Sequence, residues 1–217
     1  ELIASSYKHK WQHYTFLCDV QSSRIQLTEM KCYDGKMPLM RHLKWAYEEH
    51  PHALIVGETG SGKTYALMSF IEAVAKSGAA LVVIDAKNAD LSGLAGYLPE
   101  VYSGSADIKE QVIKFYEDML DRMESMKRCA DYEPGRNYRA LGFQARFMIF
   151  DEYVAYLSML QKKEAEEVIS YLQKIVLLGR QAGFFVILSC QRPDAKYLPD
   201  GVRDQFGLRI ALGAMTD

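Results

Sequence analysis

The sequence predicts an α/β protein with a mainly parallel central β-sheet flanked by helices. From residue 53 onward, short apolar runs alternate with stretches whose apolar residues recur at helical spacing, which is the pattern of successive βαβ units. The composition also favours a folded globular chain, since 49% of the 217 residues are hydrophobic and 25% are charged. Those fractions exclude a disordered chain, a collagen-like chain and a coiled coil. At this length one large domain, with or without a small appendage, can bury a substantial core.

Residues 1–50 differ from the rest of the chain. We expect two short strands there, over residues 14–20 and 24–28, and the second shows the alternation of a strand with one buried face. Residues 34–38, Asp-Gly-Lys-Met-Pro, are typical of a turn. The sequence therefore predicts a small N-terminal β-containing segment over residues 1–50 that packs on a larger domain over residues 51–217.

The larger domain is expected to contain buried strands that alternate with helices. The predicted strands cover residues 53–56, 81–84, 147–150, 184–188 and 208–212. Helical patterns cover residues 65–76, 108–123 and 168–176. The first helix is expected to stop at Gly78, because glycine commonly terminates helices. The methionine and aromatic residues of the second helix have the spacing of a core stripe, so we assign them to the core rather than to a ligand surface.

Charge, histidine and cysteine usage exclude several classes of function. The net charge is −2, so no large basic field indicates a nucleic-acid partner, although a local basic stripe stays open. All five histidines lie within the first 52 residues, which excludes a Ser-His or Cys-His catalytic arrangement in the rest of the chain. The four cysteines form no C-x-x-C pair and match no zinc pattern, so we expect reduced thiols.

The two ends of the chain indicate a piece of a longer protein. The chain starts at Glu1 rather than at a methionine, shows no signal peptide and stops at Asp217 just after an apolar stretch. No apolar run approaches the roughly 18 residues that a membrane span needs. We therefore expect this piece to be soluble, whether or not the longer protein has a membrane segment.

The strongest motif lies between the strand at 53–56 and the helix at 65–76. It fits the phosphate-loop pattern G-x-x-x-x-G-K-[ST] in full, and the strand and helix on either side supply the context that the pattern requires. We predict that the loop and the residue after it bind a nucleotide; these residues are Gly57, Glu58, Thr59, Gly60, Ser61, Gly62, Lys63, Thr64 and Tyr65.

Each residue type in the loop suits a polyphosphate. Backbone N–H groups at a helix N-terminus can wrap the phosphates, where the helix dipole favours negative charge. Gly57, Gly60 and Gly62 let the backbone come close and adopt positive φ. Lys63 supplies a point charge for the β and γ phosphates and is a predicted catalytic residue. The hydroxyl of Thr64 can bind Mg²⁺.

Two carboxylates follow the strand at 147–150. In an open parallel sheet the ligand lies beyond the carboxyl ends of the strands, so Asp151 and Glu152 are expected near the γ phosphate. Asp151 can hold Mg²⁺ as a Walker-B aspartate does. Glu152 can orient or deprotonate the attacking water. The alternative is a solvated strand end, where an Asp-Glu pair is common.

Several motifs, taken together and in this order, resemble the FtsK/SpoIIIE-type DNA translocase ATPases. Within that family the chain looks most like the coupling proteins of Gram-positive conjugative elements. The resemblance runs from about Asp34 to Asp217. It rests on residues 34–38, on Pro51-His52, on residues 84–87 (Ile-Asp-Ala-Lys), on the Asp151-Glu152 pair, on residues 179–183 (Gly-Arg-Gln-Ala-Gly) and on residues 188–193 (Leu-Ser-Cys-Gln-Arg-Pro).

The resemblance implies a RecA-like ATPase motor domain over residues 51–217 that stops before the last strands of the family. It implies hydrolysis of ATP with Mg²⁺, a ring, usually a hexamer, with DNA in its pore, and a location at the cytoplasmic face of the cell membrane. A relaxase and the proteins of a membrane transfer channel would be further partners. Isolated from the rest of the protein, the chain can stay monomeric.

Two further catalytic residues follow from the resemblance. Gln191 would be the sensor after the strand at 184–188, since an amide can bond both the attacking water and a γ-phosphate oxygen. Arg180 matches the arginine that reaches the nucleotide of a neighbouring subunit, where it stabilises transition-state charge. The alternatives are a loop hydrogen bond for Gln191 and an interaction of Arg180 with the dipole of its own helix.

The resemblance does not assign the residues that contact DNA. The chain also departs from the family at one motif. Four basic residues in loops that also hold tyrosines are candidates for DNA binding, namely Arg136, Arg139, Lys196 and Arg203. The alternative is that these are ordinary solvated loops or subunit contacts. The family's Asp-Pro-Lys is Asp85-Ala86-Lys87 here, and the sequence assigns Lys87 no role beyond packing or a salt bridge.

Three functions remain open from the sequence. The first is an ATP-driven DNA translocase motor that pumps DNA during conjugation. The second is a type VII-like ATPase that secretes protein, because the core motifs are shared. The third is a nucleotide-gated assembly module, in which ATP fixes the geometry of a ring without useful turnover.

Overall fold

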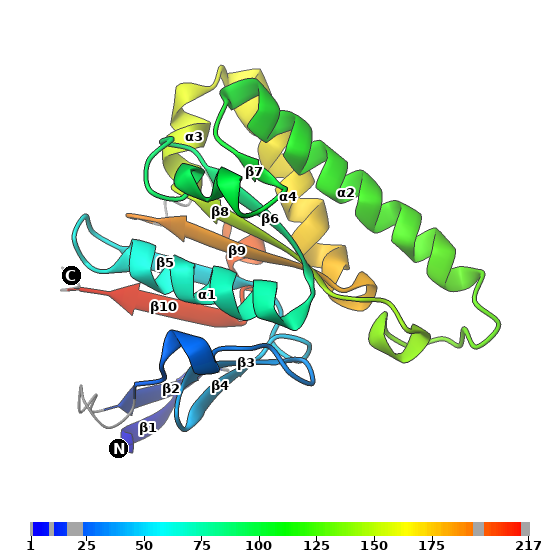
Figure 1. The fold of residues 1–217 in the computed structure, drawn as a ribbon, viewed down its shortest axis with the longest axis horizontal. Coiled ribbons are helices and arrows are strands. Elements are labelled where there is room, and N and C mark those ends of the chain that lie inside the picture. Colours follow the sequence, from blue (N-terminus) through cyan, green and yellow to red (C-terminus); the bar gives the residue numbers. More distant parts are fainter. Residues whose placement is uncertain (1, 9–10, 17–23, 193–197, 214–217) are drawn as a thin grey trace.

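The computed structural model describes residues 2–8, 11–16, 24–192 and 198–213. Its centre is a six-stranded sheet in the order β10-β5-β9-β8-β6-β7, and every neighbouring pair is parallel (Figure 1). The strands are β5 (Ala53–Gly57), β6 (Ala80–Asp85), β7 (Val101–Tyr102), β8 (Arg146–Asp151), β9 (Phe184–Cys190) and β10 (Leu208–Leu212). The predicted α/β fold with a parallel sheet is confirmed, and each of the five predicted strands is present.

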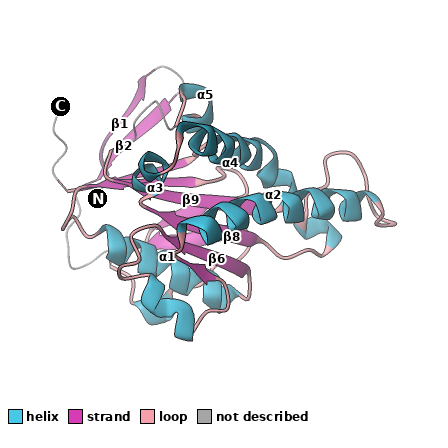
Figure 2. Ribbon diagram, turned by 90° about the horizontal axis from the view of Figure 1, so that it is seen from above, coloured by secondary structure: helices cyan, strands magenta, loops and turns pink. Residues whose placement is uncertain are grey.

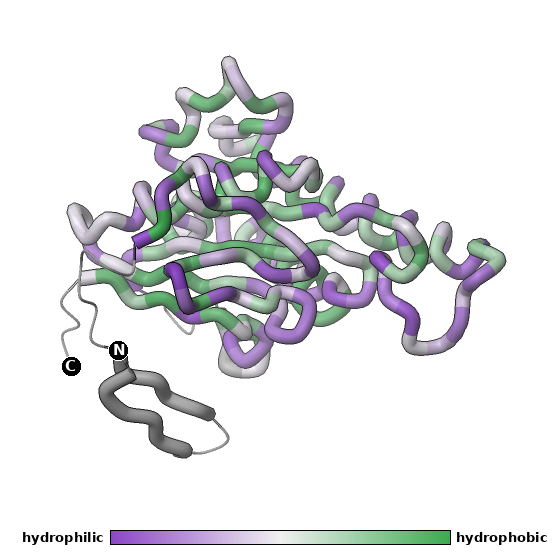
Figure 3. The backbone as a smooth tube through the Cα atoms, turned by 60° about the horizontal axis from the view of Figure 1, so that its bottom comes forward, coloured by the Kyte–Doolittle hydropathy of each residue, from purple (hydrophilic) through white to green (hydrophobic). Residues whose placement is uncertain are grey.

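The central strands are buried on both faces because their side chains alternate between two apolar cores. On β8, Met148 and Phe150 face one core, while Phe147 and Ile149 face the other. Figure 3 shows these strands as predominantly hydrophobic stretches in the interior of the molecule. A sheet covered on both faces explains why its strands appear in the sequence as continuous apolar runs.

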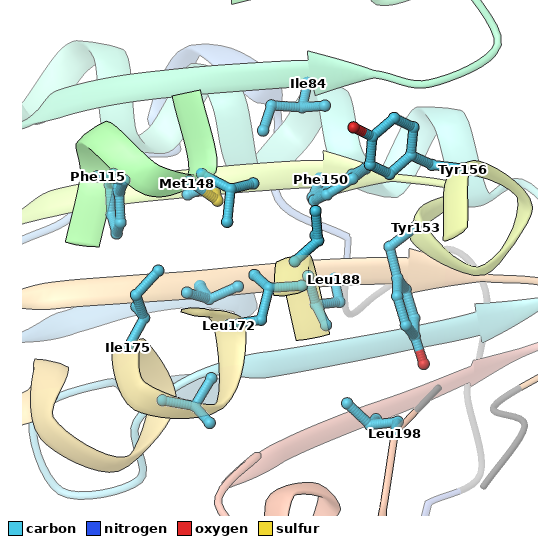
Figure 4. Close-up of a cluster of buried hydrophobic side chains, with 14 of the residues drawn as sticks. Ile84, Phe115, Met148, Phe150, Tyr153, Tyr156, Leu172, Ile175, Leu188 and Leu198 are labelled. Atoms are coloured by element: carbon cyan, nitrogen blue, oxygen red, sulfur yellow. The ribbon is translucent and has the colours of Figure 1, made fainter. Parts of the chain in front are cut away.

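Helices α2 (Ser105–Lys127), α3 (Tyr153–Met159) and α4 (Lys162–Ala182) cover one face of the sheet (Figure 2). Their buried side chains meet those of the strands, as Figure 4 shows for Phe115, Tyr156 and Leu172. A capping box between Gln161 and Glu164 starts α4. The short helix α5 (Asp200–Arg203) follows β9. The sequence predicted the central parts of α2 and α4 but not α3.

Helix α1 (Lys63–Ser77) covers the other face together with part of the N-terminal region. The hairpin of β3 (Lys36–Met40) and β4 (Leu43–Ala46) lies beside it. Tyr47 packs edge-to-face on Phe147 and Phe185, with ring centroids 5.2 and 5.0 Å apart. Residues 30–47 thus share a core with the sheet. The division of the chain at residue 50 stays a prediction.

The structure differs from the sequence prediction before β3. Strands β1 (Leu2–Lys8) and β2 (Trp11–Phe16) form an antiparallel hairpin, so only the start of the predicted strand at 14–20 is strand, and residues 17–20 lie outside the described ranges. The predicted strand at 24–28 is wrong. Local bonds from the N–H groups of Glu29 and Met30 close a 3₁₀ turn over residues 27–29, and Leu27 is exposed rather than buried.

The predicted turn at 34–38 is confirmed at its start. Asp34 and Gly35 both have positive φ, of 51° and 68°. Strand β3 then begins at Lys36, so the last three residues of the predicted turn are strand. Within the described part of the chain, no helix is long and apolar enough to cross a membrane.

A buried histidine links the start of the phosphate-loop strand to the rest of the fold. His52 is fully buried; its Nδ1 accepts from the N–H of Val186 at 3.0 Å, and its Nε2 lies 3.0 Å from the carbonyl oxygen of Val176. Because Val186 is a donor, the ring is neutral with its proton on Nε2. Burial disfavours the charged ring and lowers the pKa of His52 to about 4, although the hydrogen bond to Val176 opposes this.

We expect His52 to make the fold sensitive to mild acid. A histidine whose pKa is lower in the folded state stabilises the protein above its unfolded pKa of about 6.5 and loses that stabilisation as the pH falls toward the folded value. The expected loss is about 2 kcal/mol by pH 5. Urea denaturation at pH 7 and pH 5 measures it. His52→Gln should lose this pH dependence, whereas His50→Gln, at an exposed position, should keep it. Equal pH dependence in both variants would contradict the assignment.

Candidate nucleotide-binding site

The phosphate loop joins β5 to α1 at the carboxyl edge of the sheet. In Figure 1 it projects on the side toward which the arrowheads of β9 and β10 point. Gly62 precedes α1 with φ of 91°, a left-handed conformation that disfavours any residue with a Cβ. A Cβ on Gly57 would lie 2.4 Å from the Oγ of Ser61, so any other residue there would have to displace the Ser61 side chain.

The loop fits a phosphate group. No side chain caps the N-terminus of α1, and its first turn holds no acidic residue. Its N–H groups are therefore available to an anion. The Oγ of Ser61 is buried and has no hydrogen-bond partner within the described residues. The ammonium group of Lys63 is nearly buried beside these groups. A polyphosphate would supply acceptors to the free N–H groups and to Ser61, and negative charge close to Lys63.

Three of the four predicted catalytic side chains, Lys63, Glu152 and Gln191, meet in front of this loop. The Nζ of Lys63 lies 2.5 Å from the Oε1 of Glu152 and 3.4 Å from the carbonyl oxygen of Gly57. The Nε2 of Gln191 lies 3.5 Å from the same Oε1 and 3.5 Å from the Oγ1 of Thr59. The parallel sheet thus brings together groups that are up to 132 positions apart in the sequence.

The two carboxylates of the acidic pair lie in different environments. Burial raises the pKa of Asp151, although a hydrogen bond from Ser189 counteracts it. Burial would also raise the pKa of Glu152, but the hydrogen bond and charge of Lys63, helped by Lys87, hold that pKa below its usual value. Glu152 is therefore ionised at neutral pH and can accept a proton.

The site has ligands suited to Mg²⁺, but not a complete set. Thr64 follows Lys63 at the start of α1, and Asp151 ends β8. A hydroxyl and one or two carboxylates, completed by phosphate oxygens and water, match the usual coordination of Mg²⁺. Among the residues described, no three His, Cys, Asp or Glu side chains cluster to hold a metal by themselves.

Two side chains contribute to the site without having been predicted. Ser189 bridges the acidic pair: its hydroxyl donates to Asp151 and accepts from the N–H of Glu152 at 3.2 Å. The Nζ of Lys87 lies 3.3 Å from the Oε1 of Glu152. Both belong to motifs that the sequence singled out, but nothing in a linear sequence shows that β6 and β9 flank β8.

Arg180 lies far from this cluster. It is exposed in the last turn of α4, just before β9 begins, and so at the opposite edge of the sheet from the phosphate loop. Its Nε donates to the carbonyl oxygen of Glu48 at 2.7 Å. Tyr65, the last predicted nucleotide-binding residue, is 82% exposed at the start of α1.

Three of the four predicted DNA-binding residues lie in the described part of the chain. Arg136 pairs with Glu133 at 3.2 Å, and Arg139 pairs with Glu48 at 2.8 Å and with Asp34. Arg203 lies on α5. Lys196 lies outside the described residues. The ion pairs of Arg136 and Arg139 offset part of their positive charge.

The fold and the loop define the class of protein: a P-loop nucleoside-triphosphatase fold, with a phosphate loop at the carboxyl edge of a parallel sheet. Comparison with known sequences then confirms the predicted resemblance to the FtsK/SpoIIIE family, whose model matches residues 34–133. The Ftsk domain-containing protein YdcQ of Bacillus subtilis (strain 168) is 43% identical over the whole of this chain. The DNA translocase FtsK of Chlamydia pneumoniae is 27% identical over 74% of it.

These relatives are much longer than this chain. The aligned region spans 45% of YdcQ and 22% of the Chlamydia FtsK. Solved structures share the fold at low identity. The pCW3 conjugation coupling protein TcpA, in a monomer form with ATPγS, has a TM-score of 0.66 at 16% identity, over 100% of this chain and 66% of its own. The type VII secretion ATPase EccC of Thermomonospora curvata has a TM-score of 0.61 at 21% identity. The match covers 80% of this chain and 22% of the EccC chain.

We expect Gly62→Ala to weaken nucleotide binding. A Cβ at φ of 91° costs about 1–2 kcal/mol even where space is open, so the loop would shift to relieve it. Titration with a fluorescent ATP analogue would measure the loss. Gly93→Ala is the matched control, since that position is also open but has no such φ. Equal affinity of the two variants would argue against the loop as the binding site.

Proposed function

We propose that this chain is the motor domain of an ATP-driven DNA translocase, and that the longer protein is the coupling ATPase that pumps DNA during conjugative transfer. The single observation that carries the proposal is the cluster of Lys63, Glu152 and Gln191 against the phosphate loop. The similarity to FtsK and YdcQ sequences supports it. Because the chain spans less than half of YdcQ, the activity of the whole protein belongs to the proposal.

Each residue of the cluster has a role in ATP hydrolysis. The N–H groups of the phosphate loop bind the phosphates, and Lys63 turns from Glu152 to the β and γ phosphates. When bound, Mg²⁺ neutralises charge that develops on the phosphate oxygens; Thr64 and Asp151 are the residues that would hold it. Glu152 accepts a proton from the attacking water, and the amide of Gln191 orients that water.

Arg180 would complete the site of a neighbouring subunit. It is exposed at the edge of the sheet opposite the nucleotide loop, a position that suits contact with another copy of the chain rather than with its own site. We propose a homo-oligomeric ring, a hexamer in the longer protein, with DNA in its pore and Arg136, Arg139, Lys196 and Arg203 as candidate DNA contacts. A relaxase and membrane transfer-channel proteins are proposed partners at the cytoplasmic face of the membrane.

A second candidate function has a specific observation behind it. The type VII secretion ATPase EccC and the cytoplasmic domain of EssC share the fold with TM-scores of 0.61. A secretion motor would use the same cluster to move protein. The third candidate, a nucleotide-gated assembly module, is less favoured because Glu152 is ionised and placed to accept a proton.

The decisive experiment is ATP hydrolysis by the longest protein that contains the chain, with single- or double-stranded DNA, at two salt concentrations. We expect DNA to stimulate hydrolysis and higher salt to remove the stimulation, because phosphate contacts release counterions. Lys63→Ala and Glu152→Gln should each lower turnover by about 100-fold or more. Hydrolysis without any DNA stimulation in the assembled protein would move the assignment to protein secretion. Bound ATP that persists for hours would favour the assembly module.

Complementation tests the action of Arg180 across subunits. Arg180→Ala should lower turnover by about 10³-fold or more, since it removes a transition-state cation. Mixing it with Lys63→Ala should restore activity, because one variant keeps its nucleotide site and the other supplies Arg180. Specific activity of the unmodified protein should also rise with concentration. Activity strictly proportional to concentration, with no restoration on mixing, would show that Arg180 does not act in trans.

A further inference from the structure

We propose that Lys87 is a positioning residue for Glu152, whose carboxylate it keeps oriented when Lys63 turns to the nucleotide. The proposal rests on the ATPase activity proposed above and deepens it. Lys87 lies in the loop after β6, and its Nζ reaches the Oε1 of Glu152 at 3.3 Å. That oxygen also accepts the hydrogen bond of Lys63.

The loop that carries Lys87 is built around one buried carboxylate. Asp85 is 1% exposed and ends β6 directly beside Asp151, its partner in the β8 register. Its Oδ1 accepts from the N–H of Lys87 at 3.2 Å, and its Oδ2 accepts from the N–H groups of Ala89 and Ser92 at 2.8 and 2.9 Å. Three hydrogen bonds from backbone N–H groups to this one carboxylate fix the conformation of the loop. The loop thereby places Lys87 beside Glu152.

The charge around Glu152 changes when a nucleotide binds. Its side chain is only 10% exposed, so an unpaired negative charge there would be strongly disfavoured. Lys63 is its nearest cation in the structure but is also the cation that a phosphate loop needs for the β and γ phosphates. Once Lys63 turns away, Lys87 is the remaining cation paired with Glu152 among the described residues.

The position of Lys87 suits a residue that supports Glu152. Its side chain is 46% exposed, so it retains much of its hydration while it reaches into the site. It approaches Glu152 from the β6 side, whereas Gln191 approaches from β9. The carboxylate is thus held from two directions, because its Oε1 contacts residues that follow the two strands on either side of β8.

The test is Lys87→Met, which removes the charge and keeps the length, with Lys87→Arg as the conservative variant. In the longest protein that hydrolyses ATP, we expect Lys87→Met to lower kcat by about 10- to 100-fold, as the loss of outer partners does at metal sites. Its Kd for a non-hydrolysable ATP analogue should change less than twofold. Lys87→Arg should restore most of the turnover. Lys162→Met, at an exposed lysine of α4, is the control and should match the unmodified protein.

The outcomes separate this inference from the proposed function. If the unmodified protein hydrolyses ATP and Lys87→Met has the same kcat, the inference is wrong and the proposed function stands. A Kd for the analogue that rises in step with the fall in kcat would also overturn it, because Lys87 would then bind phosphate rather than support Glu152. If the unmodified protein hydrolyses no ATP, the proposed function fails, and positioning for catalysis fails with it.

Discussion

The parallel direction of the six strands is the constraint on which the site depends. Every strand ends at the same edge of the sheet, so residues that follow β5, β6, β8 and β9 are brought together although they are distant in sequence. The phosphate loop, Lys87, Glu152 and Gln191 each follow one of these strands. Two apolar cores, one on each face, hold the strands in register and so hold these polar groups at fixed separations.

Charge balance gives the site its chemical character. Glu152 stays ionised in a nearly buried position because two lysines contact one of its oxygens. Asp151 instead accepts a hydrogen bond from the hydroxyl of Ser189, and burial raises its pKa. Two ammonium groups thus pair with Glu152, whereas Asp151 accepts a hydrogen bond from a hydroxyl. The difference arises from what lies on the neighbouring strands, and not from the two adjacent residues themselves.

Much of the sheet could be predicted from the sequence because buried strands have an obvious composition. The bounds predicted for β10 match those observed, and the predicted phosphate loop joins a strand to a helix as its motif requires. The prediction of a strand at 24–28 was wrong, because alternation of polar and apolar residues does not by itself provide a neighbouring strand to pair with. The contact of Lys87 with Glu152 could not be predicted, because it depends on β6 lying next to β8 in the sheet. Local sequence patterns do not determine the order of strands in a sheet.

The position of β5 also determines when the nucleotide site can form during synthesis. This strand pairs with β9 on one side and β10 on the other, and both come after residue 183. A chain emerging from the ribosome carries the phosphate loop early but cannot place its strand in the sheet until more than a hundred further residues have emerged. Pairing of strands so far apart is slow. The strand that carries the loop therefore gains both of its neighbours only after residues 184–212 have been made.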